Sequence, residues 1–110
     1  MHVVIALGHD GLGHGDHELG QRVLTTFLRK APAIRGLSAI LLYNSGVRLA
    51  AEGSSVLVEL THLHEAGVDV RPCATCVDHF GLREKIAVGG ISSMDEIVSE
   101  MNRADKVISL

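Results

Sequence analysis

Two cysteines three residues apart give this sequence its clearest chemical signal. Cys73 and Cys76 enclose Ala74 and Thr75 in a Cys-x-x-Cys motif. Thiols at this spacing come within disulfide reach when the second one opens a helix, and a nearby cation such as Arg71 favours the nucleophilic thiolate. The motif predicts thiol chemistry at the two cysteines, with Arg71 and Thr75 in support. The alternative is that both cysteines are small buried hydrophobic residues.

Seven histidines are many for 110 residues, and one of them lies close to the cysteines. Since His79 follows Cys76 by three residues, the set Cys73, Cys76 and His79 could supply three zinc ligands. No second pair of cysteines or histidines stands at zinc-finger spacing. We therefore expect no metal and no other cofactor, and the zinc site is kept as an alternative.

Polar and glycine-rich turns follow the first two apolar runs of the sequence. The first turn, Gly8–Gly15, lacks the glycine spacing of a dinucleotide loop and the lysine of a phosphate-binding loop, so no nucleotide site is expected. Ser45 lacks the context of a serine hydrolase. The turn residues expected to support the thiol site are Asp10, Gly13, Asn44 and Ser45. The alternative is that they serve only the backbone geometry of turns.

Short apolar runs that alternate with stretches of helical periodicity must position these residues. The runs predict about five strands, over His2–Leu7, Leu37–Tyr43, Val68–Arg71, Lys85–Val88 and Lys106–Leu110. Strands separated by single helices form right-handed β-α-β units and a mostly parallel sheet, so the fold class is α/β. Because ligands bind beyond the carboxyl ends of parallel strands, the turns and the cysteine segment should meet at one end of the sheet.

The helices between the runs carry recognisable end signals and an apolar face. They are predicted over Asp16–Lys30, from Ser54 to a stop at Gly67, and from Ser93 past Met101. Asp16 is the expected N-cap of the first helix, and Ser93 forms a capping box with Glu96. The side chains expected to form the apolar stripe of the first helix are Leu19, Val23, Leu24, Phe27 and Leu28.

Composition places the chain among globular proteins of one domain, residues 1–110. The mass is 11.7 kDa, the formal net charge is −3, and 46% of the residues are hydrophobic. The absence of a basic cluster argues against nucleic acid, and no apolar run is long enough for a membrane helix. The first residues lack a signal peptide, so a cytoplasmic location with mostly reduced thiols is expected. With only 3% aromatic residues, the aliphatic surplus predicts buried parallel strands or an interface in a homo-oligomer.

An ordered set of segments resembles the DsrE/DsrF-like sulfur-relay superfamily, most closely the DsrE-like domain of YedF-type proteins, which are sulfurtransferase-like and associated with selenium metabolism. The segments are Leu12–Gly20, Tyr43–Leu49, Glu52–Ser54, Cys73–Asp78, Val88–Gly89, Ser93–Met94 and Ala104–Ile108. The resemblance implies a three-layer α/β sandwich with helices on both faces, which often forms trimers or hexamers. It also implies a cysteine that carries sulfur as a persulfide. Cys73, with Gly81 eight residues later, matches the position of that cysteine, and Cys76 matches only the YedF-like subgroup.

The resemblance leads to a specific functional hypothesis, a sulfur or selenium carrier of the sulfurtransferase type. The Cys73 thiolate would attack a persulfide on a donor, and Cys76 would resolve the product. Because the sequence shows no TusA-like segment, a TusA-like protein or a cysteine desulfurase is expected to act as the donor in trans. The alternative is a non-enzymatic subunit that binds a partner or small ligand and uses its thiols structurally.

Overall fold

Four parallel strands form the central sheet of the computed structural model, which describes residues 1–110. Their order across the sheet is β3-β2-β1-β4. In chain order the strands are β1 (Val3–Leu7), β2 (Leu37–Leu42), β3 (Asp69–Pro72) and β4 (Lys106–Ser109). The helices are α1 (His17–Lys30), α2 (Leu57–Glu65), α3 (Ala74–His79) and α4 (Met94–Arg103), with the short 3-10 helices η1 (Ala31–Ala33) and η2 (Asn44–Ala50).

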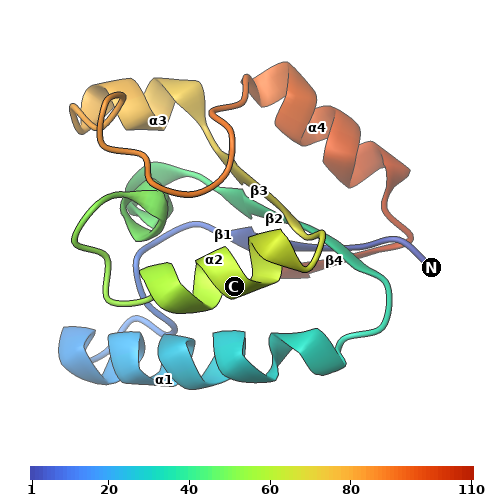
Figure 1. The fold of residues 1–110 in the computed structure, drawn as a ribbon, viewed down its shortest axis with the longest axis horizontal. Helices are drawn as coiled ribbons and strands as arrows, with labels where there is room; N and C mark the ends of the chain where they lie inside the picture. Colours follow the sequence, from blue (N-terminus) through green and yellow to red (C-terminus); the bar gives the residue numbers. More distant parts are fainter.

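Helices cover both faces of this sheet. Helices α1 and α2 lie on one side and α4 lies on the other, while α3 and η2 lie beyond the ends of the strands (Figure 1). The expected α/β sandwich of three layers is confirmed, with four strands in place of about five. No helix of the structure is both long enough and apolar enough to cross a membrane.

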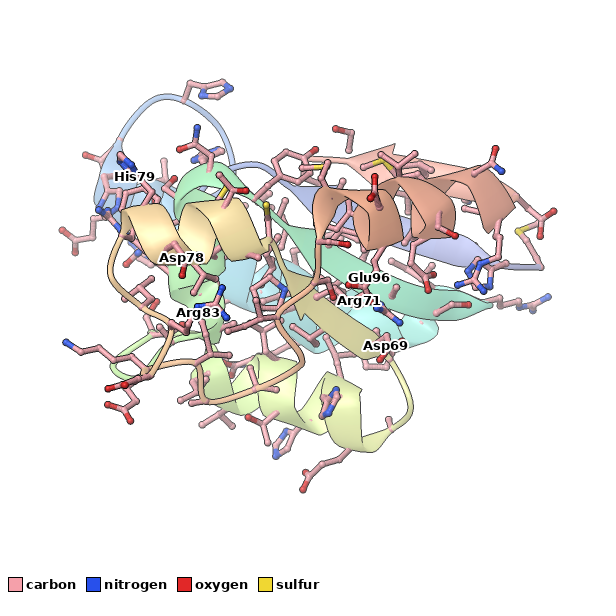
Figure 2. The ribbon with its side chains drawn as sticks, turned by 90° about the horizontal axis from the view of Figure 1, so that it is seen from above. Asp69, Arg71, Asp78, His79, Arg83 and Glu96 are labelled. Carbon is pink, nitrogen blue, oxygen red and sulfur yellow. The ribbon has the colours of Figure 1, made fainter.

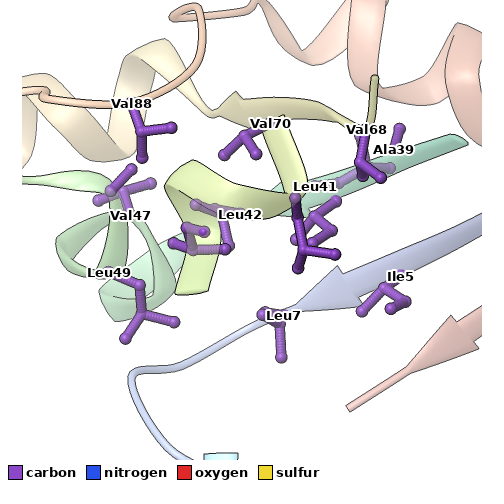
Figure 3. Packing of buried hydrophobic residues seen from close by; sticks show 14 of the residues in the cluster. Ile5, Leu7, Ala39, Leu41, Leu42, Val47, Leu49, Val68, Val70 and Val88 are labelled. Atoms are coloured by element: carbon purple, nitrogen blue, oxygen red, sulfur yellow. The ribbon is translucent and has the colours of Figure 1, made fainter. Parts of the chain in front are cut away.

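Strand β1 is the centre of the hydrophobic core. It pairs with β2 on one side and with β4 on the other, and all five of its residues are buried. Its side chains pack with aliphatic residues from the other strands and from η2, including Leu42, Val47 and Leu49 (Figure 3). A strand enclosed in this way must be apolar at every position, which explains the continuous apolar run near the start of the sequence.

The expected strand at Lys85–Val88 is wrong. Only Ile86 makes a bridge, an isolated antiparallel one with Ala51, and the amides of Ala87 and Val88 both donate to the carbonyl oxygen of Ala50. The apolar side chains of this segment therefore pack beside the end of η2 and do not extend the sheet. A short apolar run predicts burial, but it does not identify the partner against which the run is buried.

A different segment covers the outer edge of β3. The Gly90 amide donates to the Val70 carbonyl at 3.0 Å, and the Ser92 amide donates to the Pro72 carbonyl at 2.9 Å. Ser92 also forms an isolated parallel bridge with Cys73. These bonds close the β3 edge directly beside the cysteine motif, so the motif lies in a firmly paired part of the chain.

The helix starts follow the sequence signals closely. The Asp16 carboxylate accepts from the Leu19 amide at 2.8 Å, and the capping box between Ser93 and Glu96 is complete. Helix α2 begins at Leu57, three residues after the expected Ser54. The apolar stripe predicted for α1 is only partly correct. Its members Leu24 and Leu28 are buried, whereas Leu19 is 53% exposed and Val23 is 44% exposed.

Candidate functional site

The carboxyl ends of β2 and β3 bring two polar turns together. Residue Asn44 begins η2 directly beyond β2, and Cys73 directly follows β3 and caps α3. The two short helices η2 and α3 contact each other (Figure 1). Through this contact the main-chain amide of Asn44 donates a hydrogen bond to the Sγ atom of Cys76 at 3.1 Å. The expected meeting of the second turn with the cysteine segment is thus observed.

The two cysteines of the motif differ in accessibility. Both are free thiols, but Cys73 is 1% exposed and Cys76 is half-buried. The main chain holds Cys73 firmly, since its amide donates to the Leu42 carbonyl at 2.8 Å. The next amide, from Ala74, donates to the Ser92 carbonyl at 2.9 Å. Cys73 is therefore the inner thiol, and Cys76 is the thiol at the surface.

The surroundings of Cys76 hold its sulfur mainly as the neutral thiol. Partial burial raises the pKa of Cys76 above its ordinary value of 9.0, the hydrogen bond from the Asn44 amide lowers it, and a hydrogen bond and charge coupling with Cys73 raise it again. Cys73 caps α3 and Cys76 lies in the first turn of that helix, so the two thiols are neighbours. The Asn44 amide is thus the main neighbour that favours the thiolate at Cys76.

An unusual backbone conformation aims the Asn44 amide. Asn44 has a φ of 52°, and it is the only non-glycine residue of the chain with a positive φ. Its side-chain oxygen accepts from the Ser45 amide at 2.8 Å, which stabilises this left-handed turn. A Cβ atom on Gly46 would lie 2.4 Å from the Leu7 carbonyl oxygen, so the turn fits tightly against the end of β1. Ser45 supports the turn through its main-chain amide.

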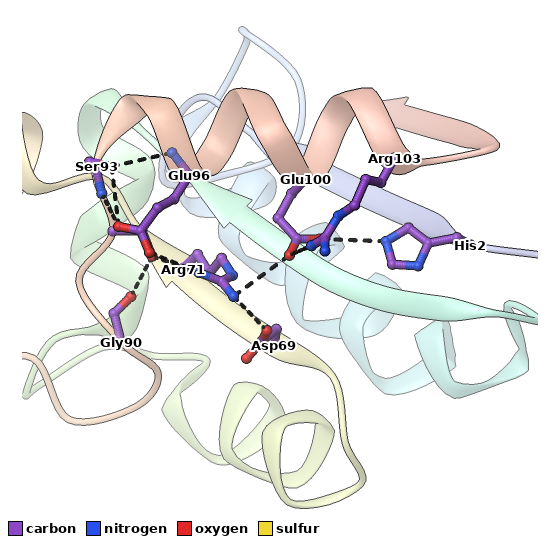
Figure 4. Close-up of polar contacts among 9 residues, drawn as sticks. His2, Asp69, Arg71, Gly90, Ser93, Glu96, Glu100 and Arg103 are labelled. Atoms are coloured by element: carbon purple, nitrogen blue, oxygen red, sulfur yellow. Dashed lines mark hydrogen bonds and ion pairs between the residues drawn. The ribbon is translucent and has the colours of Figure 1, made fainter.

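Arg71 lies in an ion-pair cluster on the sheet face under α4 (Figure 2). Its guanidinium group lies 3.0 Å from Asp69, 3.5 Å from Glu96 and 3.6 Å from Glu100, and it donates to the Ser92 hydroxyl at 3.3 Å. These acceptors surround both terminal nitrogens of Arg71, while its buried Nε atom has no partner (Figure 4). The structure therefore does not bring Arg71 to the two sulfurs, where the sequence motif suggested it would act.

The first turn lies at the same end of the sheet but donates no hydrogen bond to either thiol. Asp10 lies 3.6 Å from the Nε2 atom of His17 and 4.0 Å from the Nη1 atom of Arg48. Gly13 is exposed, has a φ of 82°, and lines a hollow of about 210 Å³. Thr75 is exposed on α3 between the cysteines. Of the residues expected to support the thiols, only Asn44 donates a hydrogen bond to one of them.

Sequence reasoning missed an aromatic and cationic contact at the edge of the site. The guanidinium carbon of Arg48, on η2, lies 4.3 Å from the ring centroid of Phe80, which follows α3. The His79 ring meets the Phe80 ring edge-on at 4.9 Å. Together with the Asp10 pair, these contacts tie the first turn, η2 and α3 to one another. Only 3% of the residues are aromatic, and this rarity was the only signal in the sequence that could have drawn attention to Phe80.

No group of three or more histidine, cysteine, aspartate or glutamate side chains has an arrangement that could hold a metal ion. The alternative zinc set of Cys73, Cys76 and His79 therefore gains no support from the geometry. The arrangement does allow thiol chemistry, since two neighbouring free thiols can pass through persulfide and disulfide forms when a persulfide donor supplies the sulfur. The site is best described by its inner thiol, its surface thiol and the amide that faces the surface thiol.

Comparisons with known proteins identify relatives of this fold and the family of the chain. Solved structures that share the fold include the ychN protein from E. coli, with a TM-score of 0.74, 20% identity, and coverage of 99% of this chain and 98% of that chain. A second is MTH1491 from Methanobacterium thermoautotrophicum, a protein of unknown function, with a TM-score of 0.73, 18% identity, and coverage of 99% of this chain and 98% of that chain. No curated protein matches the chain. The model of the DsrE/DsrF-like family matches residues 36–110, and the chain thus belongs to that family.

Proposed function

We propose that this protein carries sulfur as a persulfide on its Cys-x-x-Cys pair. One observation carries the proposal: the surface thiol of Cys76 lies one helical turn from the inner thiol of Cys73 and accepts a hydrogen bond from the Asn44 amide. Family membership suggests a sulfur-relay role in general. Two free thiols beyond the carboxyl ends of parallel strands are the group in this chain best suited to such a role.

The transfer step follows ordinary thiol exchange chemistry. A cysteine thiolate attacks the outer sulfur of a donor persulfide, the sulfur–sulfur bond of the donor breaks, and the donor leaves as a thiolate. The outer sulfur then belongs to this protein as a cysteine persulfide. No net oxidation occurs, because one sulfur–sulfur bond forms as another breaks. The thiolate of an acceptor can then attack the outer sulfur and remove it by the same reaction, and the cysteine of this protein leaves as a thiolate.

The sequence hypothesis names the partners of this reaction. A TusA-like carrier or a cysteine desulfurase would present the persulfide in trans, in a reducing compartment such as the cytoplasm. Selenium can follow the same route, because a perselenide at the donor would transfer its outer atom in the same way. The sequence also favours a homo-oligomer, and the exposed apolar residues Leu19 and Val23 on α1 give that assembly a surface.

Intact-mass measurement tests the proposal. The wild type, Cys73→Ser, Cys76→Ser and the double variant would be incubated with glutathione persulfide, cleared of the donor and weighed. We expect the wild type to gain one sulfur mass, which dithiothreitol removes, and the double variant to gain none. A wild type that gains no sulfur would contradict the carrier function. That result would favour an interaction subunit whose double cysteine variant keeps its assembly state and its partner.

A further inference from the structure

We infer that Cys76 is the thiol that receives sulfur and that Asn44 is its positioning residue. This inference rests on the proposed function and assigns the order of the two thiols within it. It reverses the roles suggested by the sequence, in which Cys73 receives sulfur and Cys76 resolves the product. Two independent observations carry it, the accessibility of the sulfurs and the direction of the Asn44 amide.

Accessibility separates the two sulfurs. A thiolate that attacks the outer sulfur of a donor persulfide must meet it along the line of the breaking bond. Cys73 is 1% exposed, its own amide donates to the Leu42 carbonyl, and the next amide, from Ala74, donates to the Ser92 carbonyl. A donor could reach this sulfur only if that pairing opened. Cys76, which is half-buried on the first turn of α3, needs no such opening.

Of the two sulfurs, only that of Cys76 accepts a hydrogen bond from the Asn44 amide. It points at the Cys76 Sγ atom at 3.1 Å, and no other main-chain amide donates to either sulfur. A hydrogen bond to sulfur strengthens when the sulfur becomes an anion. The amide therefore stabilises the attacking thiolate of Cys76 and, after transfer, the charge that returns to this sulfur when the persulfide is passed on.

The left-handed backbone at Asn44 sets this direction. Most residues avoid a φ of 52°, but asparagine tolerates it because its side chain bonds the neighbouring backbone, here the Ser45 amide. Glycine also adopts this φ freely, whereas alanine does not. The residue type at position 44 thus controls the direction of its main-chain amide, while its side chain bonds the Ser45 amide and not sulfur. Asn44→Gly should keep the amide in place, and Asn44→Ala should displace it.

The inner thiol then has a defined reaction. Cys73 Sγ can attack the Sγ atom of the Cys76 persulfide, which forms a Cys73–Cys76 disulfide as the bond to the outer sulfur breaks. The outer sulfur leaves with the electron pair as hydrosulfide. A dithiol reductant returns the disulfide to two thiols. Because both thiols lie at the first turn of α3, this step is intramolecular.

Two measurements on the whole protein test the inference. The first is the initial rate of sulfur uptake from glutathione persulfide for wild type, Cys73→Ser and Cys76→Ser. The second is the pH profile of Cys76 alkylation by iodoacetamide in Cys73→Ser, alone and combined with Asn44→Gly or Asn44→Ala. We expect Cys73→Ser to keep uptake and Cys76→Ser to lose it. With Asn44→Ala, alkylation at neutral pH should slow about fivefold and its midpoint should move to higher pH, while Asn44→Gly stays near wild type.

The outcomes separate this inference from the carrier function. Uptake that survives in Cys76→Ser and disappears in Cys73→Ser would overturn the assigned order and leave the carrier function intact. A wild type without uptake would remove both. Equal alkylation profiles for Asn44→Gly and Asn44→Ala, with both variants folded by circular dichroism, would overturn the role of Asn44. Because alkylation needs no donor protein, that result is independent of sulfur transfer.

Discussion

The Nη2 atom of Arg71 lies 3.6 Å from the Oε1 atom of Glu100, a residue of α4 that is only 5% exposed. Arg103 also bonds this carboxylate, and His2 lies 3.4 Å from it (Figure 4). A carboxylate buried to this extent needs its cations, because burial of an uncompensated charge is costly. The pair therefore explains why Arg71 faces α4 and not the thiols.

Arg71→Met should destabilise the protein without changing its thiol chemistry. Removal of Arg71 leaves Glu100 with Arg103, its closest cation, but it also takes a guanidinium group from Asp69 and Glu96, and we expect a loss of about 2 kcal/mol in the free energy of unfolding. Urea unfolding at neutral pH measures this loss. Sulfur uptake by the folded variant should equal that of the wild type.

Arg83→Met is the matched control for that variant. Arg83 pairs with Asp78 at 2.7 Å on the exposed side of α3, so its removal should change the free energy of unfolding much less. If Arg71→Met were as stable as this control and yet lost sulfur uptake, the sequence assignment of Arg71 to the thiol site would be correct.

Stability should decline in acid partly through Glu96. Hydrogen bonds from the Ser93 amide and hydroxyl, with a smaller contribution from Arg71, hold the pKa of Glu96 below its ordinary value of 4.5. A lowered pKa in the folded state means that the carboxylate stabilises the fold fully above pH 4.5, and that this contribution disappears as the pH falls through the folded pKa. Glu96→Gln should therefore lose less stability than the wild type between pH 5 and pH 3 in thermal unfolding. An identical loss in both proteins would contradict this role.

Much of the fold followed from short-range patterns. The apolar run of β1, the Asp16 cap and the capping box at Ser93 all act within a few residues, so the sequence displays them directly. The segment at Lys85–Val88 could not be resolved in this way. Its apolar residues are buried against η2, and that contact depends on how distant parts of the chain are arranged.

The candidate site shows the same difference between short-range signals, which the sequence displays, and long-range contacts, which it does not. Spacing identified Cys73 and Cys76, and the position of the motif after β3 placed it at the correct end of the sheet. Side chains alternate between the faces of a strand, but the sequence does not reveal which helix covers which face, so the direction of Arg71 was not predictable. The contribution of Asn44 comes from its main-chain amide, and the type of a residue does not show where its main-chain amide points.

The exposed stripe of α1 predicts an interface in a homo-oligomer. Leu19 and Val23 lie on the outer side of the helix and line a groove with Leu12 and Phe27. Val23→Asp should convert an oligomer to smaller species in light scattering, since a charge at the centre of an apolar interface is strongly disfavoured. Val58→Asp is the control, because Val58 is 62% exposed on α2 outside this groove. Equal masses for both variants and the wild type would place any interface elsewhere.

Alkylation should distinguish the two cysteines of the wild type before any donor is added. Because the pKa of Cys76 is raised above 9.0, the reactive thiolate is scarce at neutral pH, and the rate of reaction with iodoacetamide should rise about tenfold per pH unit between pH 7 and pH 9. Peptide mapping should find the label on Cys76, while Cys73 reacts only in urea. A rate that levels off below pH 8 would show a thiolate already formed in the resting protein. Labelling of Cys73 at the same rate as Cys76 would mean that the pairing of Cys73 with Leu42 and Ser92 opens readily, and sulfur could then enter at either thiol.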